Sequence, residues 1–295
     1  IPSSVKEIGP GCFSGCSSLT KVVVPSSIIE MSSNAFKGCT LLKQIVVSSY
    51  AQSNKMICFS GCSSLAKMAV PSILEISDKA FEGCSSLIEV TIPSSVESLK
   101  DSCFAGCSLL KEITIPSSVY EIGDHSFDGC SNLETITISS NVKTIGCSSF
   151  KDCKSLTEIS LPKSVKSIGC EIFKGCISLV KLSIQQPVET IPAFAFSGCT
   201  NLSEVSIPKS VAFIGEGAFS KCSSLKYIFI PSSSVKIQPN SFEFCDSLVF
   251  IGLTDATLAK GIKTQAKILI CDDESSAFYE YGKLFGEGDG VPVNK

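Results

Sequence analysis

Arginine and tryptophan are absent from this chain of 295 residues, and it contains a single histidine. Without arginine, the chain lacks the side chain best suited to bidentate contacts with phosphates and base edges. Its 25 basic residues are all lysines and face 28 acidic residues, so the net charge of −3 provides no basic footprint for nucleic acid. These absences argue against a nucleic-acid-binding protein.

Long apolar segments are also missing. No apolar run approaches the roughly 18 residues that a membrane-spanning helix needs, and alternating segments broken by prolines fill the chain instead. The first residues, Ile-Pro-Ser-Ser-Val, match the middle of the repeat described below and contain neither region of a secretion signal. We therefore expect a mature product or an excised piece of a longer protein.

A repeat dominates what is present. Phenylalanine recurs at a constant spacing apart from a single step that is one residue shorter, and every copy has a cysteine three positions later and a leucine six positions later. The eleven phenylalanines are Phe13, Phe36, Phe59, Phe81, Phe104, Phe127, Phe150, Phe173, Phe196, Phe219 and Phe242. A fixed period of roughly 20–29 residues is the signature of a solenoid whose coils pack on their neighbours.

Each repeat contains a strand pattern. In the fifth copy, apolar Ile113 and Ile115 flank Thr114, and this alternation predicts a strand with one buried face. A proline such as Pro116 follows the strand in seven repeats and ends its pairing. Further on, a glycine such as Gly123 predicts a turn with positive φ. The Ala/Ser-Phe-x-Gly-Cys segment is too short for a long helix, so we predict one helical turn on the convex side.

The repeat L-x-x-I-x-I-P-x-x-V-x-x-I-G-x-x-A-F-x-G-C resembles the leucine-rich repeat of BspA-like proteins, also called the Treponema pallidum type, from residue 1 to about 254. The resemblance implies an α/β repeat fold: a leucine-rich-repeat solenoid of about eleven repeats with a parallel sheet on its concave face. The third copy departs most, because Ala51 and Asn54 replace aliphatic residues there, and we expect an irregular layer.

The register fades after Leu253. We therefore divide the chain into a solenoid, 1–254, and a C-terminal cap with its tail, 255–295. Within the cap, a strand is predicted at about 266–271 and an amphipathic helix at about 273–285. Solenoid ends need such a cap with a polar outer face.

Eleven of the 17 cysteines occupy the column three positions after phenylalanine, which faces the interior. Stacked side chains in one column point the same way, and this is poor geometry for a disulfide, so we predict buried free thiols. Cys-x-x-x-Cys pairs could suggest zinc, but no second pair converges and His125 lies in a variable surface column. No metal or cofactor is predicted.

Cys147 and Cys170 belong to a different column. They occupy equivalent positions in adjacent repeats, where Asp101 and Asp124 stand in earlier copies, which suggests a position near the surface. A disulfide between these two residues is a hypothesis.

Catalysis is not predicted. Ladders of identical layers offer no convergent groups, and the sequence contains no nucleophile elbow, phosphate loop or paired-carboxylate cleft. Binding on the outward strand columns is the remaining route. The candidate protein-binding residues of the concave face are Glu89, Glu112, Glu158, Glu204, Tyr227, Phe229 and Phe250.

The aromatic members of this set allow two interpretations. Tyr227, Phe229 and Phe250 form either an exposed ligand patch or a cluster packed under the C-terminal cap or a loop at 254–265. The absence of tryptophan and arginine argues against a small, very tight interface and favours a broad, repeated contact.

The family resemblance implies a location at the surface of oral bacteria or parasitic protists and attachment to host proteins and cells. The leading hypothesis is therefore a cell-surface or secreted adhesin or antigen domain with a protein ligand. The alternative is an intracellular protein-interaction scaffold, which the many unpaired thiols and the lack of a signal segment would fit.

Overall fold

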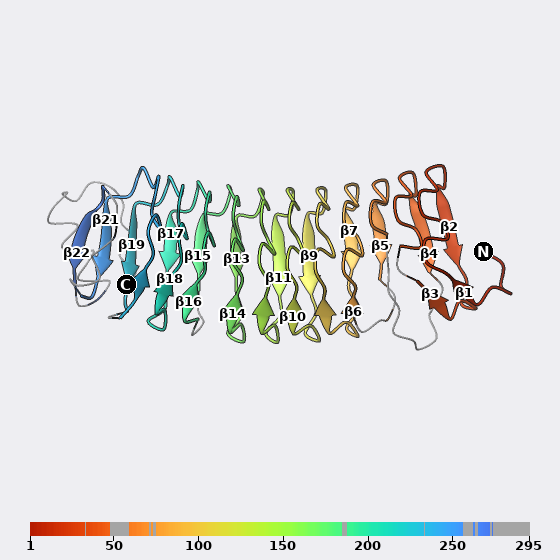
Figure 1. Ribbon diagram of the computed structural model, residues 1–295, viewed down its shortest axis with the longest axis horizontal. Coiled ribbons are helices and arrows are strands. Elements are labelled where there is room, and N and C mark those ends of the chain that lie inside the picture. Colours follow the sequence, from red (N-terminus) through yellow and green to blue (C-terminus); the bar gives the residue numbers. More distant parts are fainter. Residues whose placement is uncertain are drawn as a thin grey trace.

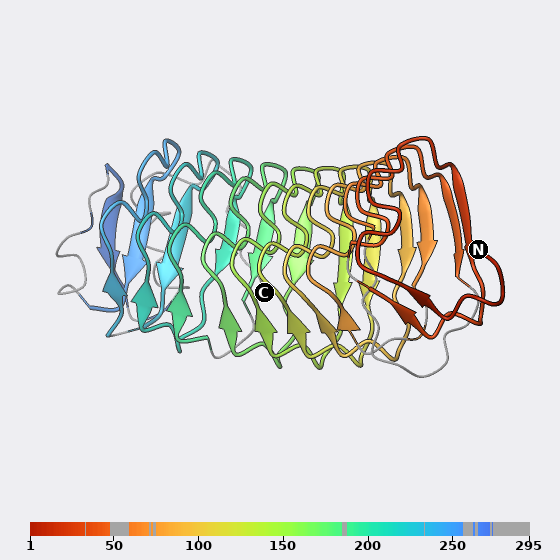
Figure 2. The same cartoon turned by 45° about the vertical axis from the view of Figure 1, so that its right-hand side comes forward.

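The computed structural model is an elongated stack of coils in which each repeat makes one turn (Figure 1). It describes residues 1–32, 34–47, 59–70, 72, 75–184, 188–232, 234–255, 262, 265–271 and 273. Two rows of parallel strands run along the stack, and both remain in order when the molecule is turned (Figure 2).

The first row, which we call the long-strand sheet, consists of strands of three or four residues. They are β2 (Lys21–Val24), β4 (Gln44–Val47), β5 (Lys67–Ala69), β7 (Glu89–Thr91), β9 (Glu112–Ile115), β11 (Thr135–Ile138), β13 (Glu158–Ser160), β15 (Lys181–Ser183), β17 (Glu204–Ser206), β19 (Tyr227–Ile230), β21 (Phe250–Leu253) and β22 (Lys267–Ile270).

The second row, which we call the short-strand ladder, consists of two-residue strands. They are β1 (Glu7–Ile8), β3 (Glu30–Met31), β6 (Glu75–Ile76), β8 (Ser98–Leu99), β10 (Glu121–Ile122), β12 (Thr144–Ile145), β14 (Ser167–Ile168), β16 (Thr190–Ile191), β18 (Phe213–Ile214) and β20 (Lys236–Ile237).

Strand pairs join equivalent residues of successive repeats. Glu112 in β9 lies opposite Thr135 in β11, its equivalent in the next repeat, and every described pairing is parallel. Proline ends the strands as predicted: β9 stops at Ile115, and the carbonyl of Pro116 accepts the N–H of Val119 at 3.1 Å in the turn that follows. The chain therefore leaves the long-strand sheet at the same point of each such coil.

A continuous stack of phenyl rings runs through the core. Successive rings of the repeat phenylalanines have centroids 5.1 to 5.9 Å apart from Phe13 to Phe242, and nearly all pairs are stacked. Leucines such as Leu133 and inward strand residues such as Ile113 fill the space around it, with under 5% of their surface exposed. Each coil thus contributes one thin layer to a single continuous core.

The helical turn predicted around each phenylalanine is wrong, because no helix occurs among the described residues. Two positions in every fully described copy of this segment have positive φ, as at Ser102 (56°) and Gly106 (72°), and this conformation interrupts a right-handed helix. Alternate N–H groups also bond to the next coil: Phe104 donates to the Ser126 carbonyl at 2.8 Å and Gly106 to the Asp128 carbonyl at 2.7 Å. The chain forms turns there.

The glycine that follows several of the short strands has a different role from the one predicted. Gly123 and Gly146 are not among the residues with positive φ. A Cβ at Gly123 would lie 2.5 Å from the Asp101 carboxylate and 2.9 Å from the Asp101 nitrogen, so glycine is needed because the preceding coil passes so close. Two other expectations, the irregular layer around Ala51 and Asn54 and the helix at 273–285 beyond its first residue, fall outside the described residues.

Replacing Phe127 by alanine tests the ring stack. The Phe127 side chain is fully buried between Phe104 and Phe150, so its loss should lower the free energy of unfolding by about 3–5 kcal/mol. Urea titration followed by circular dichroism measures the change. The control is Thr137→Ala on the exposed side of β11, which should change stability by less than about 0.5 kcal/mol; equal losses in both variants would contradict the prediction.

Candidate functional site

Strand alternation aims one set of side chains out of the long-strand sheet. We call the outward residues from β7 to β17 the strand face. Its members carry carboxylates, hydroxyls and one lysine: Glu89, Thr91, Glu112, Thr114, Thr135, Thr137, Glu158, Ser160, Lys181, Glu204 and Ser206. Glu89, Glu112 and Glu158 are exposed and Glu204 is half-buried, so the four predicted carboxylates lie along one face.

Two of these carboxylates are neutralised by neighbours on the adjacent coil. Lys67 Nζ lies 2.6 Å from a carboxylate oxygen of Glu89, and Lys181 Nζ lies 3.0 Å from one of Glu204. Both pairs are exposed and contribute little to stability. Within the described residues, no ion pair involves Glu112 or Glu158, so the middle of the strand face remains negative.

The three predicted aromatic residues lie together at the C-terminal end of the sheet. Tyr227 and Phe250 stack with ring centroids 5.8 Å apart, and Phe229 and Cys271 complete a cluster separate from the main core. Phe250 is 1% exposed and Phe229 8%, whereas Tyr227 is half-buried. Of the two interpretations left open by the sequence, this burial favours packing over an exposed patch.

The repeat cysteines form a ladder of thiol hydrogen bonds. From Cys39 to Cys245, each Sγ donates to the carbonyl of the preceding repeat's phenylalanine at 3.1 to 3.3 Å. All cysteines of the described residues are free thiols. Burial raises the pKa of Cys130 and of Cys199 from 9.0 to about 12. The thiols of this column therefore pack in the core and donate hydrogen bonds to backbone carbonyls, and they are unreactive.

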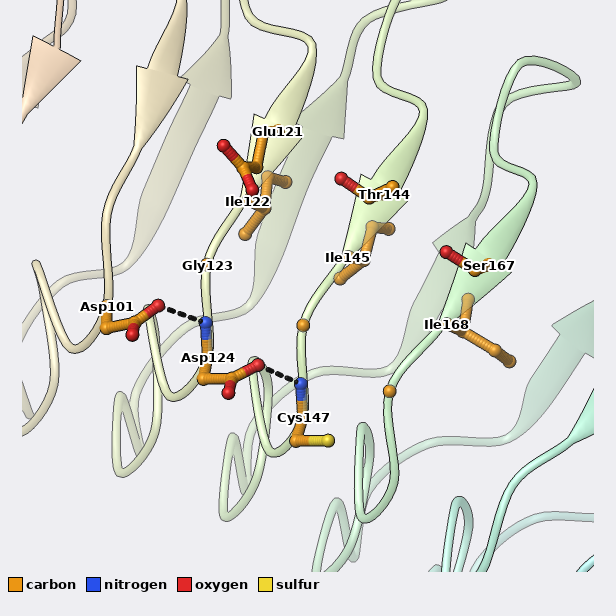
Figure 3. A pocket seen from close by; sticks show the side chains of 12 residues that line it. Asp101, Glu121, Ile122, Gly123, Asp124, Thr144, Ile145, Cys147, Ser167 and Ile168 are labelled. Atoms are coloured by element: carbon orange, nitrogen blue, oxygen red, sulfur yellow. Dashed lines mark hydrogen bonds between the residues drawn. The ribbon is translucent and has the colours of Figure 1, made fainter.

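A groove lies on the other side of the coil, along β10, β12 and β14. Its volume is about 380 Å³, and Figure 3 shows Asp101, Asp124 and Cys147 in a row across successive coils beside it. The further residues that line the groove are Glu121, Ile122, Gly123, Thr144, Ile145, Gly146, Ser167, Ile168 and Gly169.

Carboxylates in this row cap the next coil. Asp78 Oδ1 accepts the backbone N–H of Asp101 at 3.2 Å. Asp101 Oδ1 accepts the N–H of Asp124 at 2.8 Å in the same way, and Asp124 Oδ1 accepts the N–H of Cys147 at 2.6 Å. Cys147 continues the series with sulfur, which accepts the Cys170 N–H at 3.2 Å. Sequence reasoning placed Cys147 and Cys170 near the surface, as found, but missed the groove, although three aspartates spaced one repeat apart were a visible signal.

Metal-binding geometry is not found in the part of the chain that the structure describes: no three His, Cys, Asp or Glu side chains converge there. His125 Nδ1 lies 2.9 Å from an Asp128 oxygen on the surface. The described residues also include no helix that could cross a membrane.

The coils are stacked, have nearly equal length and form a parallel sheet whose outward face carries rows of polar side chains. These features define a leucine-rich-repeat scaffold. The chain belongs to the BspA-type leucine-rich-repeat family, whose model matches residues 1–107, 74–191 and 166–263. Leucine-rich repeats of this kind are scaffolds and are typically non-catalytic. No curated protein matches the chain.

Solved bacterial structures share the fold. A leucine-rich cell surface protein of Faecalibacterium prausnitzii is 26% identical to this chain and superposes with a TM-score of 0.53. The match covers 89% of this chain and 87% of the F. prausnitzii chain. A leucine-rich-repeat protein of Bacteroides ovatus is 26% identical, with a TM-score of 0.59, and the match covers 90% of this chain and 88% of the B. ovatus chain. The leucine-rich-repeat protein of T. pallidum is 34% identical over 54% of this chain and 77% of its own, with a TM-score of 0.52.

The thiol ladder makes stability depend on pH. An unfolded cysteine ionises near pH 9, whereas folded Cys130 and Cys199 keep their protons up to about pH 12. The folded state therefore binds more protons above pH 9, and its stability, complete below that pH, falls by up to about 1.4 kcal/mol per pH unit for each such thiol. Urea titrations from pH 8 to pH 10.5 measure the slope. Cys130→Ala should reduce the slope of stability against pH by the contribution of one thiol. An unchanged slope would contradict the raised pKa of Cys130.

Proposed function

We propose that this chain is a non-catalytic protein-binding scaffold at a cell surface, an adhesin or antigen domain that binds host proteins or cells. The strand face carries the proposal, because it presents exposed carboxylates and hydroxyls in parallel rows. The likeness to a cell surface protein of F. prausnitzii supports the location.

The charge of the strand face indicates the kind of partner. Glu89 and Glu112 are neighbours on β7 and β9, and Glu158 stands two coils further on, with Thr135 between. Equivalent residues of adjacent strands are about 4.8 Å apart, so a partner segment with regularly spaced lysines or arginines would meet several carboxylates at once. Electrostatic complementarity of this kind raises association rates and selects among partners.

The contact would be broad. The chain has no tryptophan or arginine to serve as an anchor, so affinity would come from many modest contacts along the stack. Tyr227, half-buried at the end of the row, would add an edge of aromatic surface. Phe229 and Phe250 would hold Tyr227 in place from within the cluster.

An intracellular interaction scaffold is the second candidate. The observation in its favour is that every described cysteine is a free thiol, which suits a reducing compartment. The two candidates share the strand face and differ in location.

Charge reversal tests the strand face. Glu112→Lys combined with Glu158→Lys should weaken binding to immobilised host matrix proteins, such as collagen, fibronectin and laminin, by at least tenfold, about 1.4 kcal/mol. Binding of the unchanged chain should also fall with rising salt. Surface plasmon resonance measures both.

The matched control is Glu97→Lys combined with Glu216→Lys. These exposed residues flank β8 and β18, away from the strand face, and the net-charge change is the same. Equal loss in both double variants would show that only net charge matters and would remove the strand face from the proposal.

Antibody staining of cells that produce the protein separates the two locations. Signal on intact cells is expected for the adhesin or antigen domain. Signal only after permeabilisation would overturn the surface location and favour the intracellular scaffold.

A further inference from the structure

Cys147 and Cys170 differ from every thiol of the buried ladder. Each ladder thiol is directed to a phenylalanine carbonyl, whereas the Cys147 and Cys170 sulfur atoms lie 2.8 Å apart and both side chains are half-buried. The S–H of Cys170 donates to the sulfur of Cys147. Among the described residues, this is the pair of thiols that face each other.

The backbone brings these residues close enough for a covalent link. They occupy equivalent positions in adjacent coils, at a spacing of about 5 Å set by parallel pairing of β12 with β14. Disulfides join Cα atoms that are about 4.4–6.8 Å apart. Gly169 lets the coils approach here, because a Cβ at that position would clash with the Cys147 nitrogen.

Hydrogen bonds give the two thiols different roles. The Cys147 sulfur accepts both the S–H of Cys170 at 2.8 Å and its N–H at 3.2 Å. The bond to Cys147, together with burial and the nearby Glu171 charge, raises the pKa of Cys170 to about 11. Cys147 is therefore the attacking thiol and Cys170 the second to react.

Cys147 is the member of the pair that lines the groove. It lines the groove of about 380 Å³ together with Asp101 and Asp124 (Figure 3). Glu121 adds a third carboxylate to the lining, and Lys100 Nζ lies 3.7 Å from an oxygen of Glu121. The groove therefore presents a negative wall beside a nucleophilic sulfur.

We propose that Cys147 and Cys170 form a dithiol site that is oxidised by small disulfides entering this groove, with cationic disulfides preferred over anionic ones. The Cys147 thiolate attacks one sulfur of the small disulfide, forms a mixed disulfide and releases the first small thiol. Cys170 then gives up its proton and attacks the Cys147 sulfur, which releases the second small thiol. The protein loses two protons and two electrons, and the small disulfide gains them. This site is independent of the proposed function of the strand face.

Peptide mapping tests the pair. Unreduced protein is incubated with cystamine, alkylated and digested with trypsin, which places Cys147 alone in peptide 144–151 and Cys170 alone in peptide 167–174. A cross-linked 144–151/167–174 species is expected, and it should disappear on reduction. Separate alkylated peptides would overturn the proposal.

Single substitutions test the roles. Cys170→Ser should accumulate the mixed disulfide on Cys147, whereas Cys147→Ser should leave Cys170 largely unmodified over the same time. The substitutions Cys12→Ser and Cys16→Ser remove from the background the two thiols that are exposed among the described residues. Equal modification of Cys147 and Cys170 in the two variants would overturn the assignment of the attacking thiol.

A series of small disulfides tests the charge preference. The cross-linking rate should decrease from cystamine, which is cationic, through hydroxyethyl disulfide, which is neutral, to oxidised glutathione, which is anionic. The differences should shrink at about 1 M salt, where the Debye length is about 3 Å. Asp124→Asn, which keeps an oxygen to accept the Cys147 N–H, should reduce the preference several-fold more than Asp78→Asn two coils away. Identical rates for all three disulfides would refute the preference.

Discussion

Stacking of equivalent side chains between coils is the interaction on which the rest of this structure depends. A single coil has no interior, and its phenylalanine gains burial only when the rings of the coils before and after cover both faces, 5.1 to 5.9 Å away. In-register pairing of the strands follows from the same requirement, because a shifted register would separate the rings. Every other column, polar or apolar, is thereby aligned along the stack.

Because equivalent residues are aligned, the same hydrogen bond recurs from coil to coil and forms a ladder. Cysteine thiols make one such ladder and aspartate carboxylates make another. The buried thiols from Cys39 to Cys245 satisfy a carbonyl of the coil before, and Asp101 and Asp124 satisfy an N–H of the coil after. A thiol is small and only weakly polar, so it fits a site that must be both packed and bonded. The high cysteine content is thus compatible with a fold that has no need of disulfides.

Several parts of the candidate site could be predicted from the sequence. Alternation within β9 was sufficient to place Glu112 outward and Ile113 inward, because side chains of a strand alternate whatever surrounds it. The environment of Tyr227, Phe229 and Phe250 could not be predicted in this way. They occupy the same outward columns as Glu112 and Thr114, but in the structure they pack with one another and with Cys271, which follows the last described strand.

The sequence by itself determined the solenoid, the length of each coil and the order of its layers, because a short period repeated from residue 1 to about 254 admits only stacked equivalents. Tertiary structure decided the features that arise between coils. The turn at Phe104 is not helical because Ser102 and Gly106 have positive φ and the N–H of Phe104 bonds to the next coil. Gly123 is required by the nearness of Asp101, not by its own φ. The facing of Cys147 and Cys170 has the same origin, since residues one repeat apart become neighbours only when the coils stack.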